Sequence, residues 1–230
     1  MLGIIGAMEE EVQELKRSMQ VQEEREIASM RFYKGNLFGK EAVVVRSGIG
    51  KVNAAICTQI LVDFFQVKAV INTGIAGSLD ANIDIGDVVI STDAIQHDVD
   101  ASIFGDPIGQ VPQMDVFAFP IDATLLEKAV LANQKANPDI KTFQGRIVSG
   151  DQFISSEEVK NKIVELFDAK CTEMEGAAIA HAAYLNHVPC VIIRAISDKA
   201  DHSAVVDYPT FEKKAIAHSV ELLRELLPTL

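Results

Sequence analysis

Short apolar runs alternate along the chain with longer stretches in which apolar residues recur at helical spacing. The run at 2–6 is apolar and ends in glycine, and Met8, Val12, Leu15 and Met19 then follow at intervals of three to four residues. A short continuous apolar run is typical of a buried strand, whereas that spacing lines one face of a helix. The beginning of the chain therefore predicts a strand followed by a helix.

The alternation continues to the end of the chain. Further strands are expected at 30–37, 42–46, 68–72, 87–95, 142–148, 171–174 and 188–196. Further helices are expected at 52–65, 122–136, 156–167, 175–186 and 209–227, the last with Pro209 near its first position. Such alternation predicts a three-layer α/β/α sandwich with a central β-sheet that is largely parallel or mixed, formed by a single domain over residues 1–230. In such sheets ligands bind beyond the carboxyl ends of the strands.

Residues 97–120 interrupt this pattern, because the segment is irregular, rich in Gly, Pro and Phe, and longer than most loops. It carries much apolar surface for a loop in water: Ile103, Phe104, Val111, Pro112, Met114, Val116, Phe117 and Phe119. We therefore expect a symmetric homodimer with this segment in the interface.

Composition and charge narrow the function classes. Hydrophobic residues make up 48% and charged residues 23%, which are values of an ordinary globular protein. The net charge of −12 argues against nucleic acid as a partner and favours a neutral or cationic small substrate. Neither a membrane-spanning stretch nor a secretory leader is recognisable, so we expect a cytoplasmic location and no membrane partner. The three cysteines and the His97-Asp98 pair show no metal-ligand spacing, and no metal site is expected.

Two of the predicted strand ends carry unusual residues. The first strand runs into GAMEEE at 6–11, which lacks the glycine pattern of a dinucleotide site and would repel a phosphate. Its glutamates either stabilise the N-terminus of the next helix or belong to a functional site, and Glu11 is the candidate for a residue of such a site. The turn expected at 73–78 contains Ala76 and Gly77, small residues that let a ligand approach backbone amides, although a plain tight turn fits equally.

Two later strand ends and one loop add further candidates. Glu173 and Glu175 flank a methionine where a strand meets a helix, and Glu175 suits either the helix N-terminus or the hydroxyls of a sugar. Asp198 follows a strongly apolar strand, so it is either a cap for the next segment or a general acid with a raised pKa. Phe153, in a glycine-containing loop, is either a core residue or a platform for a flat base.

Six strings in this order make the chain similar to the 5′-methylthioadenosine/S-adenosylhomocysteine nucleosidases, within the larger purine nucleoside phosphorylase-like group. They are GIIGAMEEEV at 3–12, SGIGKVNAA at 47–55, INTG at 71–74, VSGDQFI at 148–154, EMEGAAIA at 173–180 and RAISD at 194–198. The resemblance extends over essentially the whole chain. It implies a phosphorylase/hydrolase-like fold, a hydrolase that releases adenine without a cofactor or metal, and a role in methionine salvage.

The family's roles can be transferred to matching positions. The resemblance implies that Asp198 protonates N7 of the purine, that Ser197 orients Asp198, and that Glu11 activates the attacking water. It further implies that Glu175 holds the ribose hydroxyls. It assigns the remaining contacts with substrate to Phe153 and Ile154 around the base, Met174 against the sugar, Phe104 and Pro112 in the partner subunit's 5′ pocket, and Tyr208 and Phe211 in the chain's own. It places Arg194 nearby in the polar cluster, with Glu175 as its expected partner.

Elementary chemistry agrees with two carboxylates at such a site. Departure of a purine leaves an oxocarbenium-like ribose, which carboxylates stabilise, while the leaving nitrogen needs a proton and the water needs a base. Ile75 departs from the pattern, since a serine is expected there. Three alternatives stay open: a phosphorylase of the same fold, a nucleosidase for another 5′-modified adenosine, and a nucleoside-binding protein without catalysis. The sequence does not rank methylthioadenosine, S-adenosylhomocysteine and 5′-deoxyadenosine as substrates.

Overall fold

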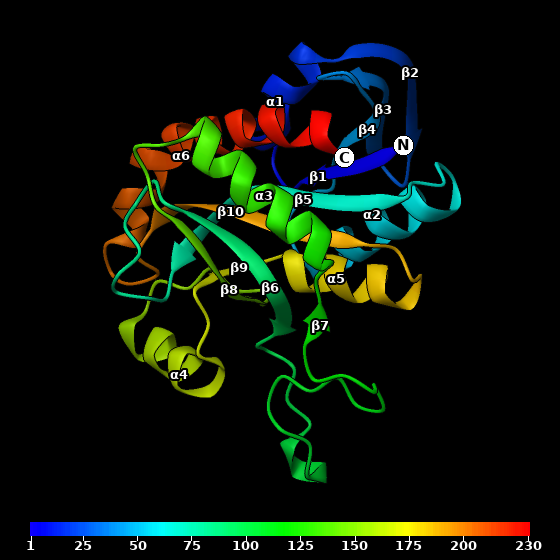
Figure 1. Cartoon of the computed structure of the whole chain (residues 1–230). Coiled ribbons are helices and arrows are strands. Elements are labelled where there is room, and N and C mark those ends of the chain that lie inside the picture. Colours follow the sequence, from blue (N-terminus) through cyan, green and yellow to red (C-terminus); the bar gives the residue numbers. More distant parts are fainter.

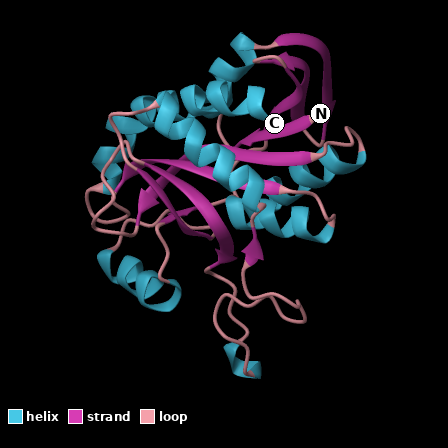
Figure 2. Cartoon of the chain, viewed as in Figure 1, coloured by secondary structure: helices cyan, strands magenta, loops and turns pink.

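The computed structural model describes residues 1–230, which form one mixed sheet with helices against its faces (Figure 1; Figure 2). The strands are β1 (Leu2–Gly6), β2 (Gln20–Ile27), β3 (Met30–Leu37), β4 (Lys40–Arg46), β5 (Ala69–Ser78), β6 (Val88–Gln96), β7 (Phe119–Pro120), β8 (Thr142–Ser149), β9 (Cys171–Glu173) and β10 (Cys190–Asp198). The helices are α1 (Glu9–Ser18), α2 (Lys51–Asp63), α3 (Ala123–Ala136), α4 (Glu157–Phe167), α5 (Gly176–Leu185) and α6 (Ala204–Leu226), with 3₁₀ turns η1 (Ser102–Phe104) and η2 (Leu227–Thr229).

The strand order is β10-β6-β8-β9-β5-β1-β4-β3-β2, with β7 paired to β6. β1 lies between β4 and β5 and is parallel to both. β10 pairs with β5 in parallel and with β6 in antiparallel fashion, so β5, β9, β8, β6 and β10 close into a circuit. The mixed sheet expected from the sequence is confirmed, and the closed circuit brings the ends of distant strands together.

The helices cover the sheet in two groups, which confirms the layered prediction (Figure 1). On one side α1, α3 and α6 pack around buried residues such as Leu15, Leu125 and Leu223. On the other side α2 and α5 pack through residues such as Leu61 and Ile179. Every residue of β5 and β10 is buried, because both faces of these strands are covered. No helix is both long and apolar enough to span a lipid bilayer.

Four strands and helices differ from the sequence prediction. One is β7, a short strand at the end of the segment 97–120 that was expected to be irregular. β2 was not expected, because its residues are mostly exposed and charged and lack the alternation of a half-buried strand. β5 continues through the residues expected to form a turn and ends only at Ser78, paired there with β9. α6 begins at Ala204, which is buried, so Pro209 lies inside the helix rather than near its first position.

The segment between β6 and β7 leaves the body of the protein, as Figure 1 shows, with η1 at its far end. It contains only η1 and otherwise follows an irregular path, as expected from its Gly and Pro content. Phe119, at its end, is buried and stacks on His181 of α5, with 4.2 Å between the ring centroids. The base of the segment is thus packed against the fold, while its tip is not.

Candidate active site

A pocket of about 220 Å³ opens where β1, β5, β9 and β10 end. This edge of the sheet is where the topology predicts a ligand site. Expected site residues in its lining are Glu11, Ala76, Gly77, Phe153, Ile154, Met174, Glu175, Ser197, Asp198 and Tyr208. Segments far apart in the sequence therefore meet around one cavity, which concentrates four carboxyl groups in it or at its wall.

Glu11 stands in the first turn of α1 and is only 6% exposed. Its Oε2 accepts hydrogen bonds from the N–H groups of Ala7 (2.6 Å) and Met8 (3.0 Å), and its Oε1 accepts one from Ile75 (3.2 Å). Burial raises the pKa of Glu11, while nearby Arg194 and these three N–H groups oppose the rise. The carboxylate is therefore fixed between β1 and β5 and is a stronger base than an exposed glutamate.

Asp198 is the last residue of β10 and is buried. Its Oδ2 accepts a hydrogen bond from the hydroxyl of Ser197 (2.9 Å), and its Oδ1 accepts one from the N–H of Ala200 (2.8 Å). Burial raises the pKa of Asp198, and both hydrogen bonds oppose that rise. Its carboxyl group consequently keeps a proton to higher pH than an exposed aspartate does, which is the property a general acid needs.

Glu175 caps α5, and its Oε1 accepts a hydrogen bond from the N–H of Gly50 (2.8 Å). Burial and the negative charge of Glu173 raise the pKa of Glu175 to about 8. Glu173 itself accepts hydrogen bonds from the N–H groups of Glu175 (3.1 Å) and Gly176 (2.8 Å) and from the hydroxyl of Ser149. Glu173 thus holds the start of α5, and with it Glu175, in place.

Arg194 lies in the polar cluster, as expected, but its partner differs from the expected one. In place of Glu175, its guanidinium pairs with Glu173 and donates to the side-chain oxygen of Asn72. It is 2% exposed and lies behind the pocket lining. The reason is topological, because Arg194 is a mid-strand residue of β10 whose side chain points into the sheet circuit beside β5 and β9.

The apolar wall of the pocket contains the aromatic residue expected to face a base. Phe153 is 51% exposed and meets Tyr208 edge to face, with ring centroids 5.8 Å apart. Ile154 is buried beside it, and Met174 lines the same cavity. A planar heterocycle can stack on such a wall while its polar edge meets the backbone.

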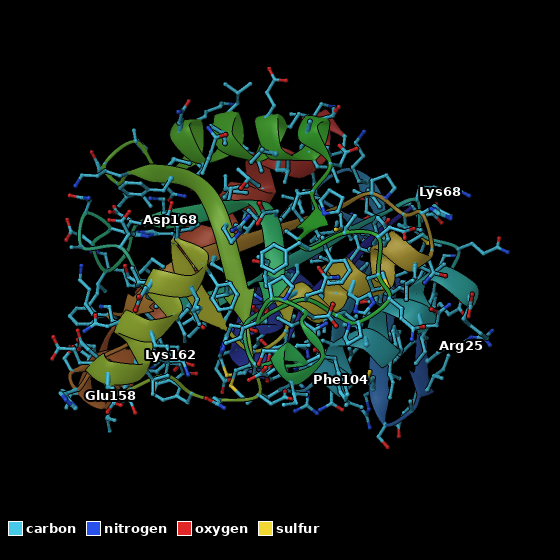
Figure 3. The ribbon with its side chains drawn as sticks, turned by 90° about the horizontal axis from the view of Figure 1, so that it is seen from below. Arg25, Lys68, Phe104, Glu158, Lys162 and Asp168 are labelled. Atoms are coloured by element: carbon cyan, nitrogen blue, oxygen red, sulfur yellow. The ribbon has the colours of Figure 1, made fainter.

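The remaining expected residues do not line the pocket of this chain. Phe104 is 87% exposed at the tip of the projecting segment, and Figure 3 labels it there. Pro112 belongs to the same segment, and Phe211 lies on α6 one turn after Tyr208, outside the lining. In the isolated chain these three side chains therefore take no part in the lining.

Sequence reasoning assigned no site role to the rest of the lining: Ala7, Met8, Ile49, Ile75, Gln152, Thr172 and Glu173. Most of these are neighbours of residues that were predicted, so proximity in the sequence was the available signal. Glu173 had a stronger signal, since it flanks Met174 together with Glu175, and an acid that ends a buried strand has to be paired. No group of three or more His, Cys, Asp or Glu side chains is arranged to hold a metal ion.

Comparison with known proteins gives the class of the protein first. Residues 1–228 match the family model described as "Phosphorylase superfamily". A curated relative from Staphylococcus aureus, named 5′-methylthioadenosine/S-adenosylhomocysteine nucleosidase, is 45% identical, with 100% of each chain covered. The chain belongs to the phosphorylase superfamily and, within it, to the family of 5′-methylthioadenosine/S-adenosylhomocysteine nucleosidases.

Solved structures agree with this assignment. The nucleosidase of this name from Neisseria meningitidis, in complex with methylthio-immucillin-A, has a TM-score of 0.95 and 41% identity, covering 100% of this chain and 99% of the other. A futalosine hydrolase from Helicobacter pylori has a TM-score of 0.94 and 34% identity, covering 100% and 97%. The fold is therefore shared by enzymes whose names give different nucleosides.

Proposed function

We propose that this enzyme hydrolyses the N-glycosidic bond of 5′-methylthioadenosine and S-adenosylhomocysteine, releasing adenine and the corresponding thioribose. The observation that carries the proposal is that Glu11 and Asp198 line one pocket, each buried and each held by its own set of hydrogen bonds. Departure of adenine requires an acid for the leaving base and a base for the attacking water. The pocket supplies one carboxyl group for each task.

Asp198 acts as the general acid. Its raised pKa keeps a proton available, and transfer of that proton to N7 lets adenine leave as a neutral base with the electrons of the broken glycosidic bond. The ribose is left with oxocarbenium character. Ser197 donates to Oδ2 of Asp198 and so directs the other oxygen of the carboxyl group. After the step Asp198 is ionised and recovers a proton for the next turnover.

Glu11 acts as the general base. A water molecule attacks the anomeric carbon and transfers a proton to Glu11, so the oxygen of that water becomes the anomeric hydroxyl. Three N–H donors and the charge of Arg194 favour the ionised form of Glu11, which is the form that accepts this proton, although burial raises its pKa. Proton transfer of this kind contributes about 10²- to 10⁴-fold to the rate.

Glu175 binds the ribose hydroxyls, and Phe153, Ile154 and Met174 enclose the base and sugar. The N–H of Gly50 occupies only Oε1 of Glu175, which leaves its other oxygen available for hydrogen bonds with a diol. The edge-to-face pair of Phe153 and Tyr208 provides an aromatic face at the pocket rim. Buried hydrogen bonds to the hydroxyls orient the sugar for attack.

Charge in the pocket favours water over phosphate as the nucleophile. Glu11 lines the pocket as the ionised general base, and the buried cation Arg194 is already paired with Glu173, so it does not offset that charge. A like charge about 4 Å away costs ~4 kcal/mol at an effective dielectric constant near 20. Since each 1.4 kcal/mol is about tenfold in rate, phosphorolysis is disfavoured by ~10³-fold.

The 5′ substituent is bound in part by a second subunit. In the isolated chain Ile103 and Phe104 are each 87% exposed, and a pair of large apolar side chains at a loop tip is typical of an interface. We infer a homodimer in which Phe104 and Pro112 complete the partner's pocket beside Tyr208 and Phe211. Such a pocket prefers an alkylthio group to a phosphate, since it lacks a paired basic group. Methylthioadenosine is thus cleaved faster than adenosine or AMP, in a cytoplasmic pathway of methionine salvage.

A second candidate substrate is futalosine, because the Helicobacter pylori futalosine hydrolase has nearly the same fold. Parallel assays with methylthioadenosine and futalosine at equal concentration separate them. The proposal requires the higher kcat/KM for methylthioadenosine.

The test of the reaction type is chromatography of the products formed from methylthioadenosine with and without inorganic phosphate. The proposal predicts adenine and free methylthioribose at a rate that phosphate does not change. Glu11→Gln should lose most of the activity, whereas Glu10→Gln, at the exposed neighbouring position, should retain it. Methylthioribose-1-phosphate as the main product, or near-normal turnover by Glu11→Gln, would contradict the proposal.

A further inference from the structure

Beside the pocket, four segments meet that sequence reasoning did not connect. They are the residue pair after β6, the loop after β8, the start of α2 and the start of α5. Their polar side chains are Asp98, Asp151, Lys51 and Glu175. Of these, only Glu175 lines the pocket. The other three therefore need a different explanation for their arrangement.

Asp98, Lys51 and Asp151 form a closed ring of contacts. One carboxylate oxygen of Asp98 accepts from Nζ of Lys51, and the other accepts from the N–H of Asp151 at 2.9 Å. Asp151 in turn accepts from the N–H of Lys51, also at 2.9 Å. The Lys51 and Asp98 side chains are 17% and 16% exposed, so their ion pair is better shielded from water than a surface pair.

Two glycines let the backbone pack closely against this ring of side chains. A Cβ on Gly150 would lie 2.5 Å from the ring of His97 and 3.2 Å from Cγ of Asp98. A Cβ on Gly50 would lie 3.1 Å from the carboxylate of Asp151, and Gly50 has a φ of +98°, which glycine adopts without strain. Both glycines thus permit the packing of the ring against its neighbours.

The ring is linked to the pocket at two points. Gly50, immediately before Lys51, donates its N–H to Oε1 of Glu175. Phe153 follows Asp151 by two residues, on the loop that Asp98 holds through the N–H of Asp151. The direction of one substrate-binding carboxylate and the position of the exposed aromatic ring therefore both depend on the same ion pair.

We propose that Asp98 is a positioning residue, which with Lys51 and Asp151 holds Glu175 and Phe153 in the arrangement that binds the nucleoside. This inference rests on the proposed function, because it assigns the ribose to Glu175 and the base to Phe153. Asp98 also begins the segment that carries Phe104, so the ring connects the base of that segment to the pocket. Loss of the ring loosens contacts made in the bound ground state, and its main kinetic effect is on KM.

Asp98→Ala and Lys51→Met test the proposal, with Asp93→Ala as the matched control. Asp93 also projects from β6 and forms an ion pair, with Arg146 of β8, in which the side chains are 26% and 29% exposed, but neither residue lines the pocket. With methylthioadenosine as substrate, KM should rise about tenfold in both ring variants, while kcat changes less than threefold. Asp93→Ala should lose comparable thermal stability and keep the KM of the wild type, and Lys51→Arg should restore most of the affinity.

Adenine binding measured by titration calorimetry provides a second readout, because it reports the Phe153 loop without turnover. The dissociation constant for adenine should rise in Lys51→Met and stay unchanged in Asp93→Ala. If Lys51→Met has the same KM and the same affinity for adenine as the control Asp93→Ala, the proposal is overturned. This result is decisive even if Asp98→Ala does not fold. If the wild-type enzyme binds adenine but does not cleave methylthioadenosine, the proposed function fails while the calorimetric test of the ring still stands.

Discussion

Gly74 and Glu11 are packed so closely that a Cβ on Gly74 would lie 2.5 Å from Oε1 of Glu11. The same Cβ would lie 2.8 Å from Nη1 of Arg194. β5 therefore passes directly behind the proposed general base, and the absence of a side chain at this position lets the carboxylate reach the N–H of Ile75. A comparable relationship holds at Gly77, where a Cβ would lie 2.7 Å from Oδ1 of Asp198.

Gly74→Ala should displace Glu11 and lower kcat by at least about 100-fold, the magnitude that loss of a general base gives. Substrate binding should change little, because the atoms nearest to that Cβ belong to Glu11 and Arg194 and not to Glu175 or Phe153. Gly39→Ala is the control, since a Cβ at Gly39 meets nothing within 4 Å and its φ of +86° adds only local strain. Wild-type kcat in Gly74→Ala, measured by adenine release, would show that Glu11 tolerates displacement.

Glu175 should make stability depend on pH in a defined direction. Burial and Glu173 raise the pKa of Glu175 from an ordinary value near 4.5 to about 8, so the folded state favours the protonated form. The contribution of Glu175 to the free energy of unfolding is fully present below the pKa that this residue has in the unfolded chain. It is lost as the pH rises through about 8. The melting temperature of Glu175→Gln minus that of the wild type should therefore rise by several degrees from pH 5 to pH 9. Each kcal/mol shifts the melting temperature by ~2–4 °C in a chain of this size.

Calorimetric melting of both proteins at these two pH values measures the effect. Glu14→Gln, at an exposed position of α1, serves as the control for removing a glutamate from the surface. A melting-temperature difference between Glu175→Gln and the wild type that stays constant from pH 5 to pH 9 would show that Glu175 is not stabilised in its protonated form.

The role of Phe104 in a partner's pocket can be tested by complementation. Phe104→Ala should raise KM for methylthioadenosine, and Asp198→Asn should lower kcat strongly. In a mixed dimer, the pocket built on the Phe104→Ala chain has its own Asp198 and receives the intact Phe104 of the other subunit. Mixing the high-KM variant with the low-kcat variant should therefore restore low-KM activity in one pocket per dimer. Activity that does not exceed the sum of the separate variants, with subunit exchange verified, would place Phe104 outside the partner's pocket.

The fold was predictable wherever burial leaves a periodic signal. The runs that became β1, β5 and β10 are apolar because both faces of these strands are covered. In the amphipathic helices, apolar residues recur at helical spacing because one face of each helix is buried. β2 left no such signal, since it is an edge strand with a mostly exposed, charged sequence. The early start of α6 was also hidden, because a proline usually marks the first turn of a helix.

The sequence predicted which residues form the site better than it predicted the contacts between them. Glu11, Glu175 and Asp198 stand where strands end, which the topology of the sheet turns into one pocket. The pairing of Arg194 with Glu173 instead of Glu175 depends on which side of β10 faces β9, and no local sequence pattern encodes that. The ring of Lys51, Asp98 and Asp151 joins three segments far apart in the sequence and became visible only in the folded chain.

The division of labour between Asp198 and Glu11 is tested most directly with two leaving groups. A 4-nitrophenyl 5-thioriboside carries a leaving group that departs as a stable anion and needs no proton, unlike adenine. Asp198→Asn should lose about 10²- to 10⁴-fold in kcat on methylthioadenosine, the range for loss of a general acid, and stay within a few-fold of the wild type on the nitrophenyl substrate. Glu11→Gln should be impaired on both substrates, because each needs an activated water. Equal losses on the two substrates in Asp198→Asn would contradict protonation of the base by Asp198.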